Sequence, residues 1–197
     1  MILGLIKPMF KTLASSAFLA MTSVAAAADF TVLTAKGYVR FTTPDQWAVL
    51  SMQTKPPVSV AAFQVANPAD EGTPHSSNVA VSIFSAGTER GDAAASGVGQ
   101  QYGKLPPSVS TLEGWTIYSQ EAQQQGAAYT IIDAKRPFAD VVVGLRFAWP
   151  HLAGNPPGYD QSMRRAFESL RRSVSYGSGI PALRPGEVLR RPATDEK

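Results

Sequence analysis

Three consecutive strand-like runs constrain the fold more than any other feature of this sequence. Residues 114–123 and 127–136 mix apolar and polar side chains with the period of a strand, and residues 141–149 are rich in β-branched and aromatic residues. The connections between the runs, 124–126 and 137–140, are too short for a crossover helix. The three runs therefore predict an antiparallel meander.

Four further strands are predicted before the meander, at residues 38–43, 47–52, 58–66 and 78–86. The segment between the last two is rich in proline, glycine, aspartate and serine, which favour turns over regular structure. This segment is therefore predicted to be a loop.

A short helix is predicted between the fourth strand and the meander. Asp92 can act as its N-cap, and Ala95, Val98 and Tyr102 recur at helical spacing. Two glycines within this stretch each cost about 1 kcal/mol relative to alanine, so the helix should depend on packing. The proline pair at 106–107 ends it.

A second, longer helix is predicted near the end of the chain, with Asp160 as its N-cap and a stop near Gly177. One apolar stripe runs along it, formed by Tyr159, Met163, Ala166, Phe167, Leu170 and Val174. The arginines outside this stripe are expected to form a solvated basic side: Arg164, Arg165, Arg171 and Arg172. The whole element order predicts an α+β fold, with an antiparallel sheet covered by helices.

Three of these segments resemble the PsbP-like α/β/α sandwich family. The first is a strand with the pattern F-x-x-P-x-x-W, which is expected to turn into a hairpin: Phe41, Pro44 and Trp47. The second is the meander, with Trp115, Tyr129, Asp133 and Arg146. The third is the closing helix, with Phe167, Leu170, Arg171, Arg172 and Ser173. The resemblance implies a non-enzymatic binding or assembly role.

The N-terminus matches a secretory signal peptide. Lys7 and Lys11 precede an apolar run, and a tract of small residues follows, so cleavage after Ala27 or Ala28 is expected. An uncleaved membrane anchor is the alternative, but the apolar run is short for a span. Met9 offers a second possible start for a more compact signal.

The predicted organisation is a signal peptide at 1–28, one domain at 29–176 and a disordered tail at 177–197. The tail is rich in proline and mixed charge and shows no periodicity. Export to a bacterial periplasm follows as the expected localisation, with no stable membrane insertion once the signal is cleaved.

Composition excludes several classes of function. The chain has no cysteine, which rules out disulfides, thiolate metal sites, a cysteine nucleophile and a lipid-anchored lipoprotein. Removal of Lys7 and Lys11 with the signal lowers the formal net charge from +3 to +1. A charge this small gives no basis for binding nucleic acid.

The sequence contains one candidate set of metal ligands. His75 lies in the loop with Asp70 and Glu71, and His151 follows the last strand of the meander. If these loops met, an Asp/Glu/His cluster could hold Zn²⁺ or Mn²⁺. The alternative is that both histidines are solvated, so no cofactor or metal is assigned.

No known catalytic or nucleotide-binding motif is present in the sequence. Asp133 is the most interesting acid because it lies within a strand. It is either a buried carboxylate or a surface residue paired with a cross-strand base such as Arg146.

The segment after the meander is the predicted partner-binding edge. It leads from an aromatic strand end into a loop rich in proline and glycine, which can hold a rigid docking surface. Its candidate contact residues are Trp149, His151, Leu152, Asn155 and Tyr159.

The leading functional hypothesis is an exported, non-catalytic protein that acts as an assembly, adaptor or accessory factor for another protein. A periplasmic immunity protein that neutralises a secreted toxin is one alternative. A binder of metal or small ligands, and a hydrolase with an unrecognised site, are the others. The sequence leaves the partner and the oligomeric state open.

Overall fold

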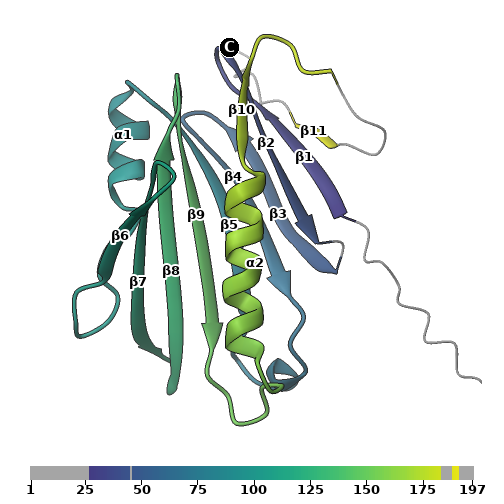
Figure 1. Ribbon diagram of the computed structural model, residues 1–197, viewed down its shortest axis with the longest axis vertical. Coiled ribbons are helices and arrows are strands. Elements are labelled where there is room, and N and C mark those ends of the chain that lie inside the picture. Colours follow the sequence, from purple (N-terminus) through teal and green to yellow (C-terminus); the bar gives the residue numbers. More distant parts are fainter. Residues whose placement is uncertain (1–26, 45, 183–187, 191–197) are drawn as a thin grey trace, which may run out of the picture.

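The computed structural model describes residues 27–44, 46–182 and 188–190 (Figure 1). The larger of its two sheets contains β3 (Trp47–Lys55), β4 (Val58–Val65), β5 (Ser77–Ser85), β6 (Ser108–Leu112), β7 (Trp115–Gln124), β8 (Ala127–Pro137) and β9 (Val141–Pro150). The smaller sheet contains β1 (Ala27–Leu33), β2 (Gly37–Pro44), β10 (Ser175–Ser178) and β11 (Val188–Arg190). The helices are α1 (Glu89–Ser96), α2 (Tyr159–Ser173) and a short 3₁₀ turn at Pro68–Asp70.

The seven strands of the larger sheet follow the order β3-β4-β5-β9-β8-β7-β6, and all of its pairs are antiparallel. The smaller sheet has the order β10-β2-β1-β11, in which only the β1–β11 pair is parallel. The prediction of an α+β fold with sheet covered by helices is confirmed. The seven strands predicted from periodicity all lie within observed strands or within two residues of them.

The elements form three layers. The smaller sheet and α2 cover one face of the larger sheet, here called the inner face, and α2 contacts both β2 and β9 (Figure 1). The other face, the outer face, carries α1, which contacts β5, and the segment at 97–107 that follows it. The two faces alternate along each strand because successive side chains point to opposite sides.

The main core lies on the inner face. Aromatic rings join the two sheets: Phe63 of β4 meets Phe30 of β1 at a centroid distance of 5.4 Å and Phe41 of β2 at 6.4 Å. Phe147 of β9 meets Phe167 of α2 edge-on at 5.5 Å. These contacts bury the apolar stripe predicted for α2 and explain why the strands alternate apolar with polar residues.

The predicted hairpin at Pro44–Trp47 is wrong in its pairing. β2 belongs to the smaller sheet and β3 to the larger one, so this corner carries the chain from one sheet to the other. Phe41 and Trp47 are both buried, because the two strands turn their apolar faces toward the same core. Asp45, which was expected in the turn, lies outside the described residues.

The first helix is shorter than predicted and begins earlier. Thr88, not Asp92, is its N-cap, and the Thr88 hydroxyl accepts a hydrogen bond from the Gly91 amide. The helix stops at Ser96, so Val98 and Tyr102 reach the outer face of the sheet from an irregular segment.

The second helix matches its predicted stripe, but its start, its end and one of its arginines differ: it ends at Ser173, and Gly177 belongs to β10. Gly158 occupies the N-cap position with a left-handed backbone (φ 77°), and Asp160 lies in the first turn. Arg171, expected on the solvated basic side, is 1% exposed. Its guanidinium donates to Glu168 and to Glu113 in the β6–β7 turn, at 2.8 and 2.9 Å.

Strands occur at the C-terminal end of the described chain, and the N-terminal prediction stays untested. Gly177 and Ser178 pair with β2, and Val188–Arg190 pairs with β1, although disorder was predicted for residues 177–197. The predicted signal peptide lies outside the described residues except for Ala27 and Ala28, which open β1. No helix in the described part of the chain is long and apolar enough to cross a membrane.

Candidate functional site

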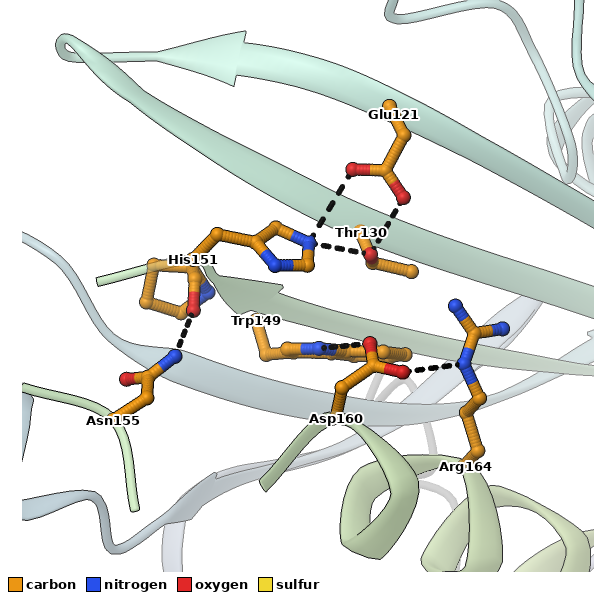
Figure 2. Close-up of polar contacts among 8 residues, drawn as sticks. Glu121, Thr130, Trp149, His151, Asn155, Asp160 and Arg164 are labelled. Atoms are coloured by element: carbon orange, nitrogen blue, oxygen red, sulfur yellow. Dashed lines mark hydrogen bonds and ion pairs between the residues drawn. The ribbon is translucent and has the colours of Figure 1, made fainter. Parts of the chain in front are cut away.

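The predicted partner-binding edge lies where β9 ends and the loop to α2 begins (Figure 2). Trp149 is fully buried, and its indole N–H donates to Asp160 at 3.1 Å. Asn155 donates to the Pro150 carbonyl at 2.8 Å and accepts from the side chain of Asn67 at 2.9 Å. These bonds fix the loop against the body of the protein.

The other predicted contact residues differ in exposure. The Tyr159 hydroxyl donates to Ser77 at 2.7 Å, and burial raises the pKa of this tyrosine. Leu152 is half-buried in a small apolar cluster with Tyr129 on the outer face. His151 is exposed. Of the five predicted residues, only His151 is exposed, with 41% of its side-chain surface accessible.

A hydroxyl, an imidazole and a carboxylate come together beside this loop. Thr130 Oγ1 lies 2.7 Å from His151 Nε2 and donates to Glu121 Oε1 at 2.7 Å, and Glu121 Oε2 lies 3.3 Å from the same ring nitrogen (Figure 2). Neither Thr130 nor Glu121 was assigned a role from the sequence. Strand pairing sets Glu121 of β7 opposite Thr130 of β8, and Thr130 opposite Trp149 of β9. Spacing along the sequence does not show these neighbours.

This arrangement differs from a nucleophile–base–acid triad. In such a triad the acid orients the imidazole through the ring nitrogen opposite the nucleophile. Here Thr130 and Glu121 approach the same nitrogen of His151. Thr130 is also fully buried, so a substrate cannot reach its hydroxyl. The cluster is therefore suited to holding the strand ends together.

The proposed metal ligands are not brought together. His75 contacts the Tyr129 hydroxyl at 3.3 Å, while His151 contacts Thr130. Tyr129 and Thr130 are neighbours in β8, and neighbouring side chains of a strand point to opposite faces of the sheet. The two histidines therefore contact opposite faces of β8. Across 27–44, 46–182 and 188–190, no three histidine, aspartate or glutamate side chains gather as a metal site.

The acids of the predicted metal set have other partners or are free in solvent. Asp70 accepts from the Ser77 amide at 3.1 Å and from Asn67 at 3.2 Å. Burial raises the pKa of Asp70 more than these bonds and the charge of His75 lower it. Glu71 is exposed.

Asp160 connects the start of α2 to β9. It accepts from Trp149 and from Arg164, whose guanidinium lies 5.7 Å from the Trp149 ring centroid. Burial acts to raise the pKa of Asp160, but the hydrogen bond and charge of Arg164 and the bond from Trp149 outweigh it, so the pKa is lowered.

Acid should therefore weaken this junction. Because the pKa of Asp160 is lower in the folded state, its contribution to stability is complete above the pKa of an unfolded aspartate, about 4, and is lost as the pH falls through the lower folded value. Asp160→Asn should flatten the dependence of the thermal midpoint on pH in this acid range. An unchanged slope between about pH 5 and pH 2 would contradict the assignment.

Comparison with known proteins gives little further guidance. No protein-family model and no curated protein sequence matches the chain. Among solved structures, the chain is similar to LpqN, described as involved in cell envelope biogenesis of Mycobacterium tuberculosis. The two are 13% identical, the match covers 76% of this chain and 91% of LpqN, and the TM-score is 0.43. A match this weak supports no argument about function, and membership of the PsbP-like family is not confirmed.

A fully exposed strand lies elsewhere, at one edge of the larger sheet. All five residues of β6 are exposed, including Val109 at 61% and Leu112 at 43%. Leu105, in the segment before β6, is 77% exposed. Sequence reasoning did not identify this strand. Val109 and Thr111 alternate with Ser108 and Ser110, which is a pattern typical of a strand. The run is short and follows two prolines, so the pattern was not recognised.

Proposed function

We propose that the chain is an exported, non-catalytic binding protein, an assembly, adaptor or accessory factor that holds another protein through the free edge of β6. The partner contributes an extended segment that adds to the larger sheet as a further strand. The observation that carries the proposal is the exposed, uncharged edge strand SVSTL.

The backbone of β6 is suited to this role. β6 pairs with β7 on one side only, and no described strand lies on its other side. An edge strand offers a row of amide and carbonyl groups to a second chain, and proteins use such edges to bind extended peptides. The five residues of β6 include neither charge nor proline, so nothing in the strand itself opposes pairing.

The opposite edge of the same sheet provides a contrast. β3 has a register shift between Val49 and Ser51 and ends at Lys55. Bulges and lysines are common means of protecting an edge from a second chain, whereas a proline pair flanks both edge strands, at 56–57 after β3 and at 106–107 before β6. The β6–β7 register runs without a shift. The two edges therefore differ in how open they are to a partner.

The chemistry of β6 indicates the kind of segment it accepts. Val109 and Thr111 point to one face of the sheet and Ser110 and Leu112 to the other, which favours small polar or apolar residues opposite them. A segment of this kind can pair along all of β6 without burying an unpaired charge.

Strand addition can be tested with a charge on the edge. The tagged protein should capture a stoichiometric partner from an envelope extract, and Val109→Lys should abolish capture because a lysine on an edge strand opposes pairing with a further strand. Val49→Lys on β3 is the matched control, since Val49 is also exposed, at 54%. It should capture the partner normally. In the isolated complex, the β6 amides should be protected from hydrogen exchange.

Three outcomes would overturn the proposal. One is the recovery of no stoichiometric partner, and another is equal loss of capture in both lysine variants. The third is a dimer of the purified protein, seen by light scattering, that Val109→Lys dissociates, because the edge would then belong to a second copy. A captured toxin would identify the binding role as that of an immunity protein.

A further inference from the structure

A hollow of about 260 Å³ opens on the outer face of the larger sheet beside α1. Its floor consists of small residues on two neighbouring strands: Ala80 and Ser82 of β5 and Gly144 of β9. Phe84 and Val98 form an apolar wall; a side chain at Gly144 would approach Phe84 to 2.9 Å and Val98 to 3.2 Å. The hollow exists because these three floor positions carry little or no side chain.

A buried carboxylate orients an arginine along this hollow. Asp133 of β8 is 1% exposed, and its two oxygens accept from Nε and Nη2 of Arg146 on β9 at 2.7 and 2.9 Å. The hydrogen bonds that Arg146 donates to Asp133 raise the pKa of Arg146 and keep it cationic. This bidentate pair fixes the plane of the guanidinium, which is the geometry that arginine uses to bind carboxylates.

Several hydrogen-bond donors that line the hollow are available to a ligand. The Arg146 side chain is 40% exposed, and no acceptor within the described part of the chain faces its Nη1. The Tyr102 hydroxyl accepts from Nη2 at 2.6 Å, which leaves its own proton available, and its ring lies 4.6 Å from the guanidinium carbon. The Ser82 hydroxyl also lines the hollow. The open groups are therefore mainly donors beside an apolar wall.

We propose that this hollow binds a small monocarboxylate with an apolar body. The carboxylate would accept from Nη1 of Arg146 and from the Tyr102 hydroxyl, while the body would lie against Phe84 and Val98. Asp133 neutralises much of the charge of Arg146, so a singly charged acid suits the hollow better than a dianion. Convergent polar groups beside an apolar wall are typical of small-molecule sites, and a hollow of about 260 Å³, smaller than most ligand pockets, suits only a small acid. The proposal is independent of the partner strand at β6.

Benzoate is the probe, and benzamide is its neutral counterpart of almost the same shape. Titration followed by two-dimensional NMR should show saturable shifts at the Arg146 Nε–H and the Gly144 and Val98 amides, with a dissociation constant of about 1 mM. Benzamide should bind at least about tenfold more weakly, because it lacks the charge that strengthens the hydrogen bonds.

Two variants locate the site without removing the ion pair. Ala80→Leu fills the floor, and Tyr102→Phe removes one donor; both should weaken benzoate binding, the first by at least about tenfold. Arg165→Gln on the exposed side of α2 is the charge control and should leave binding unchanged. Equal binding of benzoate and benzamide, unchanged binding in Ala80→Leu, or the absence of saturable shifts in the wild type would each overturn the proposal.

Discussion

Trp47→Ala is expected to destabilise the protein by about 3–5 kcal/mol, the cost of removing a large aromatic side chain from a core. Trp47 is 6% exposed, and its ring lies 6.1 Å from that of Phe63 and 5.7 Å from that of Phe147. It stands at the corner where the chain passes from the smaller sheet to the larger. The smaller residue would leave a cavity at the junction of both sheets.

Urea denaturation of the wild type and the variant measures this loss as a lower midpoint with little change in slope. Val49→Ala is the control in the same strand and should shift stability by less than about 0.5 kcal/mol, since Val49 is 54% exposed. If Trp47→Ala kept full stability and lost only partner capture, Trp47 would be a binding residue and its structural role would be wrong.

Arg171→Ala is expected to cost about 2–4 kcal/mol because it removes a long buried side chain that packs within the fold. Arg171→Met should cost less than about 1.5 kcal/mol, since it keeps most of the volume and removes a charge that is costly to bury. Glu113 and Glu168 can remain hydrated without their partner, as their side chains are 59% and 38% exposed. The difference in stability between the two variants therefore measures the contribution of side-chain packing separately from that of the charge.

Thermal and urea unfolding of the two variants test the contrast. Arg172→Met is the control, because Arg172 is 69% exposed and lies 3.9 Å from Glu168, and its effect should stay within about 0.5 kcal/mol. If Arg171→Met were as unstable as Arg171→Ala, the ion pairs, and not the packing of the side chain, would be what stabilises the end of α2.

Periodicity allowed most of the regular structure to be predicted. The meander, its short turns and the apolar stripe of α2 all follow from spacing along the chain, because a half-buried strand or helix must repeat its apolar side. Residues 141–149 and the stripe at Met163, Phe167 and Leu170 illustrate this, and all three stripe residues are buried as predicted.

Periodicity along the chain does not predict contacts between distant segments. Nothing in the pattern around Pro44 tells a hairpin from a corner between two sheets, since both need a turn between two strands. Arg171 has the spacing of a flanking residue, and its burial depends on Glu113, which lies 58 positions earlier. β6, β10 and β11 are too short to show a period.

The candidate sites were partly predictable. Asp133 and Arg146 were identified as a possible cross-strand pair because the meander sets them opposite each other, and the structure makes Asp133 both buried and paired. Tyr102, the third member, was assigned to a helix that ends before it. Trp149 was predicted at the surface because it precedes a loop, but its indole points into the core.

The smaller sheet links the order of synthesis to the order of folding. Its inner strands, β1 and β2, come first in the chain, and its outer strands, β10 and β11, follow α2. The early hairpin must therefore wait with both of its edges unpaired until β10 and β11 have been made, and pairing across such a separation is slow. The larger sheet needs neither of these strands, so it can form first and offer the hairpin a surface on which to stay while its outer strands arrive.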